Sequence, residues 1–218
     1  MLINRLDLLI SGTAQTLEMV FISALFAVVF GLPLGVLLFI TRNPHLFKRP
    51  IMHSVLGFTV NVLRSIPFII LLVAITPLTR LIVGTSIGTV AAMVPLAISA
   101  IPFFARLVES AMSEVPVGLI EAALAMGAST AQIVGKVLIP EARSTIVRAI
   151  TLTLITLVGY SAMAGAIGGG GLGNLAIMYG YERFEIRVML MTVVILIVMV
   201  QLFQWSGDRI AKKLAHNI

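Results

Sequence analysis

The 218-residue chain is 59% hydrophobic and 11% charged, with a mean hydropathy of +1.11, whereas soluble domains usually carry about a quarter charged residues. This composition excludes an ordinary soluble domain. The net charge is +6, but Lys and Arg flank apolar runs and form no basic stripe, so we expect no nucleic-acid partner. Cysteine is absent, and the histidines His45, His53 and His216 lack ligand spacing, so no metal site is expected.

Long uncharged runs predict an all-α membrane protein, because backbone polar groups in lipid must be paired within a helix or a closed barrel. Five transmembrane helices are expected, at about residues 19–41, 58–78, 83–105, 149–168 and 188–207, in a transmembrane domain covering 12–207. The uncharged stretch from Ala149 to Tyr181 is too long for one span. A glycine-rich segment, Gly168–Gly173, is expected to follow the fourth helix as a packing element or a hinge.

The distribution of Lys and Arg predicts that the N-terminus lies outside and the C-terminus inside. The inside would then hold Arg42, Lys48, Arg49, Arg64, Arg106, Lys136, Arg143, Arg148, Arg209, Lys212 and Lys213. The outside would keep Arg5, Arg80, Arg183 and Arg187. Because Arg5, Asp7 and Glu18 precede the first long apolar run, we expect no cleaved signal peptide.

Arg64 is the one charge embedded in an apolar run. We expect it at the inner end of the second span, where it could snorkel to the interface or pair with the cytoplasmic loop. A role in a transport pathway is the alternative.

Residues 106–148 form the longest predicted cytoplasmic connection, and four Glu residues within it balance its Lys and Arg. Pro116 can begin a helix over 117–126, and Gly127 suits the left-handed position that ends one. Ser129 or Thr130 can cap a second short helix over 131–138, which Pro140 would end. Two short helices joined at a fixed corner predict a rigid knob.

The knob contains Glu121-Ala122-Ala123, then Gly127 three residues later, and Val137-Leu138-Ile139-Pro140 after nine more. This pattern resembles the E-A-A-x3-G-x9-I-x-L-P signature of ABC importer permeases, with Val137 for Ile and Ile139 for Leu. The resemblance implies a coupling helix seated in a groove of a cytoplasmic ATPase subunit. There Ala122 and Ala123 would allow close approach, Gly127 would fix the corner, and Glu121 would orient docking. An ordinary loop with helix-breaking Gly and Pro is the alternative.

Residues 61–69, 83–88 and 157–163 are similar to the permeases of bacterial methionine ABC importers, in the type I class. The resemblance implies a homodimer in the cytoplasmic membrane, two ATPase subunits that bind ATP and Mg²⁺, and an extracytoplasmic methionine-binding lipoprotein. The chain itself would then be no enzyme and hold no cofactor. It would carry L-methionine and D-methionine, with another amino acid or a quaternary amine as the alternative solute.

Polar side chains on the fourth predicted span could line a transport pathway. Thr153, Thr156, Tyr160 and Ser161 lie broadly on one helical face, and the thioether of Met163 is nearby. Simple helix packing is the competing interpretation. An ion-coupled transporter or a membrane enzyme is disfavoured, because the spans lack the ionisable residues or the nucleophile, base and metal patterns that these require.

Overall fold

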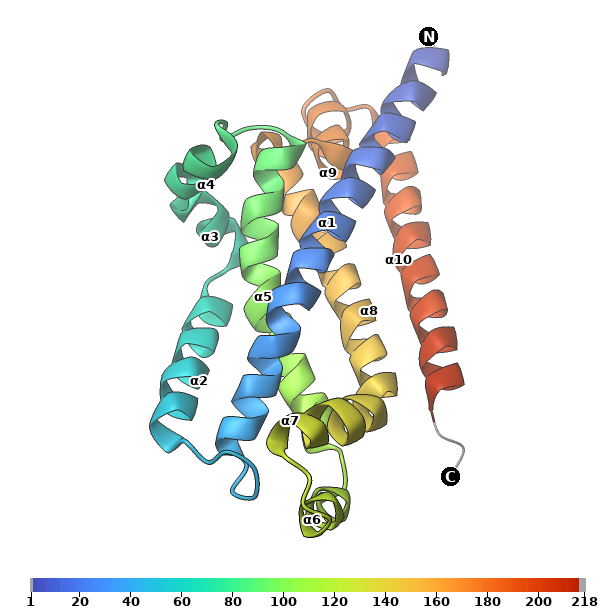
Figure 1. The fold of residues 1–218 in the computed structure, drawn as a ribbon. Coiled ribbons are helices and arrows are strands. Elements are labelled where there is room, and N and C mark those ends of the chain that lie inside the picture. The colour runs from blue at the N-terminus through green and yellow to red at the C-terminus, as the bar shows by residue number, and fades with distance from the viewer. Residues whose placement is uncertain (1, 216–218) are drawn as a thin grey trace.

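A computed structural model describes residues 2–215 of the chain (Figure 1). Regular structure within these residues is helical. The helices are α1 Leu2–Arg42, α2 Pro50–Ser65, α3 Phe68–Ala74, α4 Thr76–Val83, α5 Thr89–Ser113, α6 Val117–Ala125, α7 Thr130–Ile133, α8 Ile139–Ala164, α9 Gly171–Leu175 and α10 Ile186–Leu214. Two wider π-helical turns, η1 Val134–Leu138 and η3 Ala176–Tyr181, follow α7 and α9, whereas the segment η2 Gly165–Gly169 after α8 is kinked, with non-helical backbone at Ile167 and Gly168.

Four helical stretches are long and apolar enough to cross a membrane: Leu6–Arg42, Thr89–Ser113, Thr130–Gly169 and Ile186–Leu214. The pair α2 and α3 makes a fifth crossing if it is counted as one bent span. The predicted all-helical membrane fold is therefore confirmed, and the count of five spans holds only with the bent pair included.

The first helix begins far ahead of the predicted start at residue 19. Polar side chains in its early turns do not interrupt it, because hydroxyl groups donate to carbonyls of the same helix. Thr13 Oγ1 donates to Leu9 O at 2.7 Å, and Thr16 Oγ1 donates to Gly12 O at 2.9 Å. The third predicted span, in contrast, begins later than expected, at Thr89, because Gly84 and Gly88 take positive φ values of 83° and 103° before it.

The second predicted span, 58–78, is not one straight helix. It starts earlier, at Pro50, and ends at Ser65, where α2 and α3 meet at an angle of 99°. Proline disfavours helical backbone in the residue before it and offers no amide hydrogen to the preceding turn. Ile66 accordingly takes an extended conformation, with φ −79° and ψ 121°. The hydropathy of this run hides the break, because Ile66 and Pro67 add no charge to it.

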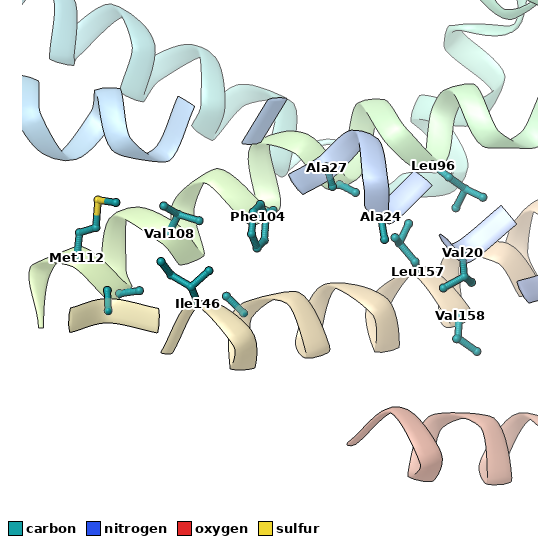
Figure 2. Close-up of a cluster of buried hydrophobic side chains, with 14 of the residues drawn as sticks. Val20, Ala24, Ala27, Leu96, Phe104, Val108, Met112, Ile146, Leu157 and Val158 are labelled. Atoms are coloured by element: carbon teal, nitrogen blue, oxygen red, sulfur yellow. The ribbon is translucent and has the colours of Figure 1, made fainter. Parts of the chain in front are cut away.

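The core lies between α1, α5 and α8, where buried aliphatic and aromatic side chains meet (Figure 2). Phe104 on α5 is fully buried, and Leu157 on α8 is nearly so. Helices α1 and α5 approach closely because glycine stands at their crossing. A Cβ added at Gly31 would lie 2.9 Å from Ile101 O, and one added at Gly35 would lie 2.6 Å from Val108 Cβ. Small residues of this kind allow close helix packing in membranes.

The glycine-rich segment after α8 is tightly packed at one end of the bundle. Gly171 N donates to Gln15 Oε1 at 2.8 Å, and Leu172 N donates to Thr16 Oγ1 at 2.9 Å, so α1 caps the start of α9. A Cβ at Gly165 would lie 2.8 Å from Gly173 C. These contacts favour the packing interpretation of the segment over a free hinge.

Helix α10 packs on α8 at the edge of the bundle. Near its C-terminal end, Arg143 Nε donates to Leu214 O at 3.0 Å and Ser144 Oγ donates to Ala211 O at 2.9 Å. Both acceptors are carbonyls in the last turn of α10; Ala211 O also accepts from Ala215 N at 2.9 Å, whereas Leu214 O lies at the very end of the helix, where the carbonyls run out of partners along the chain. The described C-terminal end therefore lies beside the start of α8, at the end of the bundle that also holds α6 and α7 (Figure 1).

Candidate functional site

The knob predicted from the sequence is present, with α6 and α7 at the end of the bundle that also holds the end of α1 and the start of α2 (Figure 1). Gly127 has φ +78°, which confirms its predicted left-handed conformation. Gly127 N donates to Leu124 O at 2.9 Å and Ala128 N donates to Ala123 O at 3.0 Å. This pair of bonds is a Schellman motif, which satisfies the last carbonyls of α6 and fixes the exit direction of the chain.

Ser129 caps the next helix, as one of the two predicted alternatives. Gln132 N donates to Ser129 Oγ at 3.4 Å, and Ser129 N donates to Gln132 Oε1 at 2.8 Å. This capping box places the cap of α7 two residues after Gly127 and the first residue of α7, Thr130, three residues after it. The corner between α6 and α7 is therefore fixed by hydrogen bonds on both sides.

The two faces of α6 have different surroundings. Ile120 and Ala123 are 2% and 4% exposed and belong to the main core, whereas Glu121 and Ala122 face outward. Ala123 thus packs inside this chain, and only Ala122 of the predicted alanine pair is available for close approach by a partner. Glu121 forms no ion pair among the side chains that the structure describes, those of residues 6–215.

The second half of the motif lies in a continuous helix. The predicted second short helix, 131–138, does not end at Pro140, because α7, η1 and α8 follow one another without a break. Pro140 occupies the first turn of α8, directly after the wider turn η1. A wider turn accommodates a ring that an ordinary α-helical turn would crowd. Val137 and Ile139 are partly buried against the core, and Pro140 is exposed.

The knob is joined to the long helices on both sides. Val115, between α5 and α6, is buried in the core. Glu114, which follows α5, accepts a hydrogen bond from Thr145 Oγ1 of α8 at 3.1 Å. A displacement of α6 and α7 would therefore move α5 and α8 with it, because packed elements transmit small shifts as units.

A buried ion pair ties α5 to α2 near the knob, and sequence reasoning missed it. Arg106 Nη1 lies 2.6 Å from Glu109 Oε2, and Glu109 is 4% exposed. Arg106 Nη2 also donates to Asn61 Oδ1 at 3.0 Å and to Gly57 O at 3.1 Å, both on α2. Opposite charges three residues apart on one helix were the available signal.

The predicted pathway residues on α8 divide into two groups. Thr153 and Ser161 are each 2% exposed and donate to carbonyls of their own helix, so they do not reach the surface of this chain. Met163 is exposed and Thr156 is partly exposed. The Tyr160 ring stacks on Phe68 of α3, with ring centroids 4.5 Å apart. Of these predicted residues, three reach the surface of this chain at least in part: Thr156, Tyr160 and Met163. Their role in a pathway stays a prediction.

Arg64 does not lie at the knob end of its helix, where the sequence suggested it. It is the penultimate residue of α2, about 21 Å along that helix from Pro50 at 1.5 Å per residue. The placement differs from expectation because α2 begins at Pro50 and not near residue 58. The guanidinium lies 6.0 Å from the ring centroid of Phe103 on α5, in cation–π range.

Comparison with known proteins agrees with this architecture. Residues 28–216 match the family described as binding-protein-dependent transport system inner membrane component. The probable D-methionine transport system permease protein MetI of Vibrio cholerae is 54% identical over 211 residues, which cover 97% of this chain and 94% of that protein. The D-methionine transport system permease protein MetI of Escherichia coli is 56% identical over 158 residues, covering 72% and 73% of the two chains.

Solved structures show the same fold. The MetNI methionine ABC transporter, solved in inward-facing conformations, contains a chain that superposes with a TM-score of 0.95 at 52% identity, covering 97% of this chain and 98% of that one. An amino acid ABC transporter solved with histidines has a TM-score of 0.80 at 22% identity, a likeness that concerns the fold alone. This chain belongs to the family of inner membrane components of binding-protein-dependent transport systems.

Proposed function

We propose that this chain is the permease subunit of an ATP-driven importer that carries methionine, as both L- and D-enantiomers, across the bacterial cytoplasmic membrane. Relatives that are 51 to 56% identical are D-methionine permeases or probable ones, and the superposed solved structure is a methionine ABC transporter. The single observation that carries the proposal is the superposition on that transporter, with a TM-score of 0.95 and 52% identity over 97% of this chain.

The knob supplies the physical basis for coupling to an ATPase. Its outward face combines the small Ala122, the carboxylate of Glu121 and the exposed apolar side chains of Leu119 and Met126. A rigid, protruding helix with one charge suits a groove in a partner, because the free geometry already matches the bound one and little ordering entropy is lost on docking. ATP and Mg²⁺ would be bound by that partner.

We infer a complex of two copies of this chain, two ATPase subunits and an extracytoplasmic methionine-binding lipoprotein. The knob end of the bundle would face the cytoplasm, so that the N-terminus is outside and the C-terminus inside. Arg42, Lys48 and Arg49 lie at that end, together with the last turn of α10 that holds Lys212 and Lys213 (Figure 1). Positive residues on the cytoplasmic side support this orientation.

Closure of the two ATPase subunits would bring the two knobs together. Each knob is packed against α5 and runs directly into α8, so the movement would reach the membrane-spanning helices and alternate the access of a central pathway. Formal charge is sparse in these helices, so solute selection would rest mainly with the binding protein.

Reconstitution tests the proposal. The chain, its partner ATPase and its binding protein are placed in lipid vesicles, and uptake of labelled L- and D-methionine is followed with and without ATP. Accumulation of methionine that requires ATP and the binding protein is the expected result. Uptake of a quaternary amine or of another amino acid, with methionine ignored, would contradict the substrate while leaving the transport class intact.

A further inference from the structure

The geometry points to Arg64 as a residue of the translocation pathway that presents its guanidinium to the carboxylate of the passing solute. This inference rests on the proposed function and adds a residue to it. No described acidic residue forms a salt bridge with Arg64. Its guanidinium lies over the face of the Phe103 ring.

The depth of Arg64 in the bundle follows from its neighbours. Phe103 lies between Ile101 and Val108 of α5, the stretch that packs on Gly31 and Gly35 of α1. Gly35 is seven residues, or about 10 Å of helix, before the charged end of α1 at Arg42. Arg64 is therefore level with the apolar interior of the helices and not with the interface.

The direction of Arg64 excludes the lipid face of α2. Gly57 and Val60 are the buried residues of this helix, and Arg64 follows them at the seven- and four-residue spacing that shares a helical face. Phe58, on another side of α2, is 71% exposed and suits lipid. Arg64 is nevertheless exposed, although it lies on the packed face. It thus projects into space that this chain leaves unfilled beside α5.

The backbone at this level also requires polar surroundings. Helix α2 ends at Ser65, and the last carbonyls of a helix have no partner within it. Non-helical backbone at membrane depth is tolerated where it is buried in protein or lines a water-filled cavity. Asn61, exposed on α2 one turn before Arg64, accepts from Arg106 and adds a polar group to the same face. The exposed arginine, the amide of Asn61 and the end of α2 together indicate a surface that faces water and not lipid.

The solute supplies the charge that Arg64 lacks. The acidic residue of α5 is Glu109, six residues after Phe103. Its carboxylate is already bonded to Arg106. The carboxylate of a free amino acid can form a charge-assisted bond to a guanidinium. Because the site is exposed to water, such a bond is weak enough to release the solute, as conduction requires.

The absence of cysteine from the chain allows a direct test of water access. Arg64→Cys and the matched control Phe58→Cys are assembled with the ATPase in lipid nanodiscs and treated with a cationic, membrane-impermeant methanethiosulfonate. Labelling of this chain is followed by mass spectrometry. We expect Arg64→Cys to react at least about tenfold faster than Phe58→Cys, because only a hydrated thiol ionises to the reactive thiolate. Equal, slow labelling at both positions would overturn the pathway assignment, whatever solute the importer carries.

A transport assay tests the carboxylate contact. Arg64→Gln is expected to lower ATP-driven methionine uptake about tenfold, equivalent to about 1.4 kcal/mol, with assembly of the complex unchanged. Arg64→Lys, or Arg64→Cys modified with an aminoethyl group, should restore uptake, and Cys modified with a neutral methylthio group should not. Phe103→Leu removes the ring and keeps the cation, so it should retain uptake. Normal uptake by Arg64→Gln, or an equal loss in Phe103→Leu, would refute the contact. Failure of the unmodified importer to carry methionine would instead refute the proposed function.

Discussion

Thr151 of α8 lies against the backbone of Gly207 of α10 so closely that a Cβ added at Gly207 would stand 2.6 Å from Thr151 Cγ2. This is a close crossing of α8 and α10, and it matters for the attachment of α10 because most of the apolar surface of α10 faces outward. Gly207→Ala should therefore lower the free energy of unfolding by about 1–3 kcal/mol through overpacking. The midpoint of thermal unfolding of the purified permease in detergent checks this.

The neighbouring change Ser206→Ala is the control, because Ser206 is exposed and the substitution adds no atoms at the crossing. Combining Gly207→Ala with Thr151→Gly should recover part of the loss, because it removes the side chain that the new methyl group meets. Equal unfolding midpoints for Gly207→Ala and the unmodified protein would contradict this account of the crossing.

The cap that α1 places on α9 predicts a contrast between two threonines one turn apart. Thr16→Val keeps the shape but leaves the amide of Leu172 without its acceptor, which should cost about 1–3 kcal/mol because that amide is buried. Thr13→Val removes only a bond to Leu9 O in the same helix, so its effect should be small. Denaturation in detergent compares the two, and similar losses would show that the cap contributes nothing.

The buried pair Arg106 and Glu109 should be costly to break from one side. Glu109→Ala leaves the guanidinium without its carboxylate, and we expect a loss of about 3 kcal/mol or more in stability. The double variant Arg106→Met with Glu109→Met should be more stable than Glu109→Ala, because no unpaired charge remains. Glu121→Ala removes an exposed carboxylate for which no ion pair is seen among the described side chains, and it is the control. A double variant less stable than the single one would argue against the pair acting through its charges.

The outward carboxylate of the knob gives a prediction about ATPase binding. Glu121→Lys should weaken association with the ATPase at least about tenfold while the chain still inserts in the membrane, because reversal of one docking charge costs about 1.4 kcal/mol or more. Glu141→Lys makes the same charge change at an exposed position in the first turn of α8. Co-purification with a tagged ATPase measures both. Equal recovery of the two variant complexes would refute docking through Glu121.

The corner of the knob can be tested without changing any contact. Gly127→Ala and Gly118→Ala each place a methyl group in open space, but only Gly127 has a positive φ, at +78°. The first substitution should therefore cost about 1–2 kcal/mol of local backbone energy, and the second, in helical backbone, should be neutral or favourable. ATPase recovery and unfolding midpoint should fall for Gly127→Ala alone. A matching fall for Gly118→Ala would mean that added bulk, and not backbone geometry, disturbs the knob.

The sequence was informative where local chemistry decides structure. The positions of Gly127 and Ser129 predicted the corner of the knob, because a left-handed glycine and a capping serine act through their own backbone. The long uncharged runs predicted the helical membrane fold for the same kind of reason, since lipid leaves few alternatives for the backbone.

Features that depend on distant partners could not be predicted in this way. The predicted first span begins at position 19 and leaves out the polar residues before it, yet Gln15 and Thr16 bond to Gly171 and Leu172 far along the chain. The burial of Ala123 and the depth of Arg64 likewise depend on which elements pack beside them. The predicted second span does not include the bend after Ser65, although Pro67 indicates it. Hydropathy reports how apolar a segment is and carries no information about the direction of its backbone.

The side chains of α8 that hold the end of α10 bind its main chain and not its side chains. Arg143 and Ser144 donate to the carbonyls of Leu214 and Ala211, and every residue type carries such a carbonyl. The identity of residue 214 can therefore drift among relatives without loss of its hydrogen bond. Shortening the chain to end before Leu214 would instead remove an acceptor. At this corner of the protein, chain length is under stronger physical constraint than chain composition.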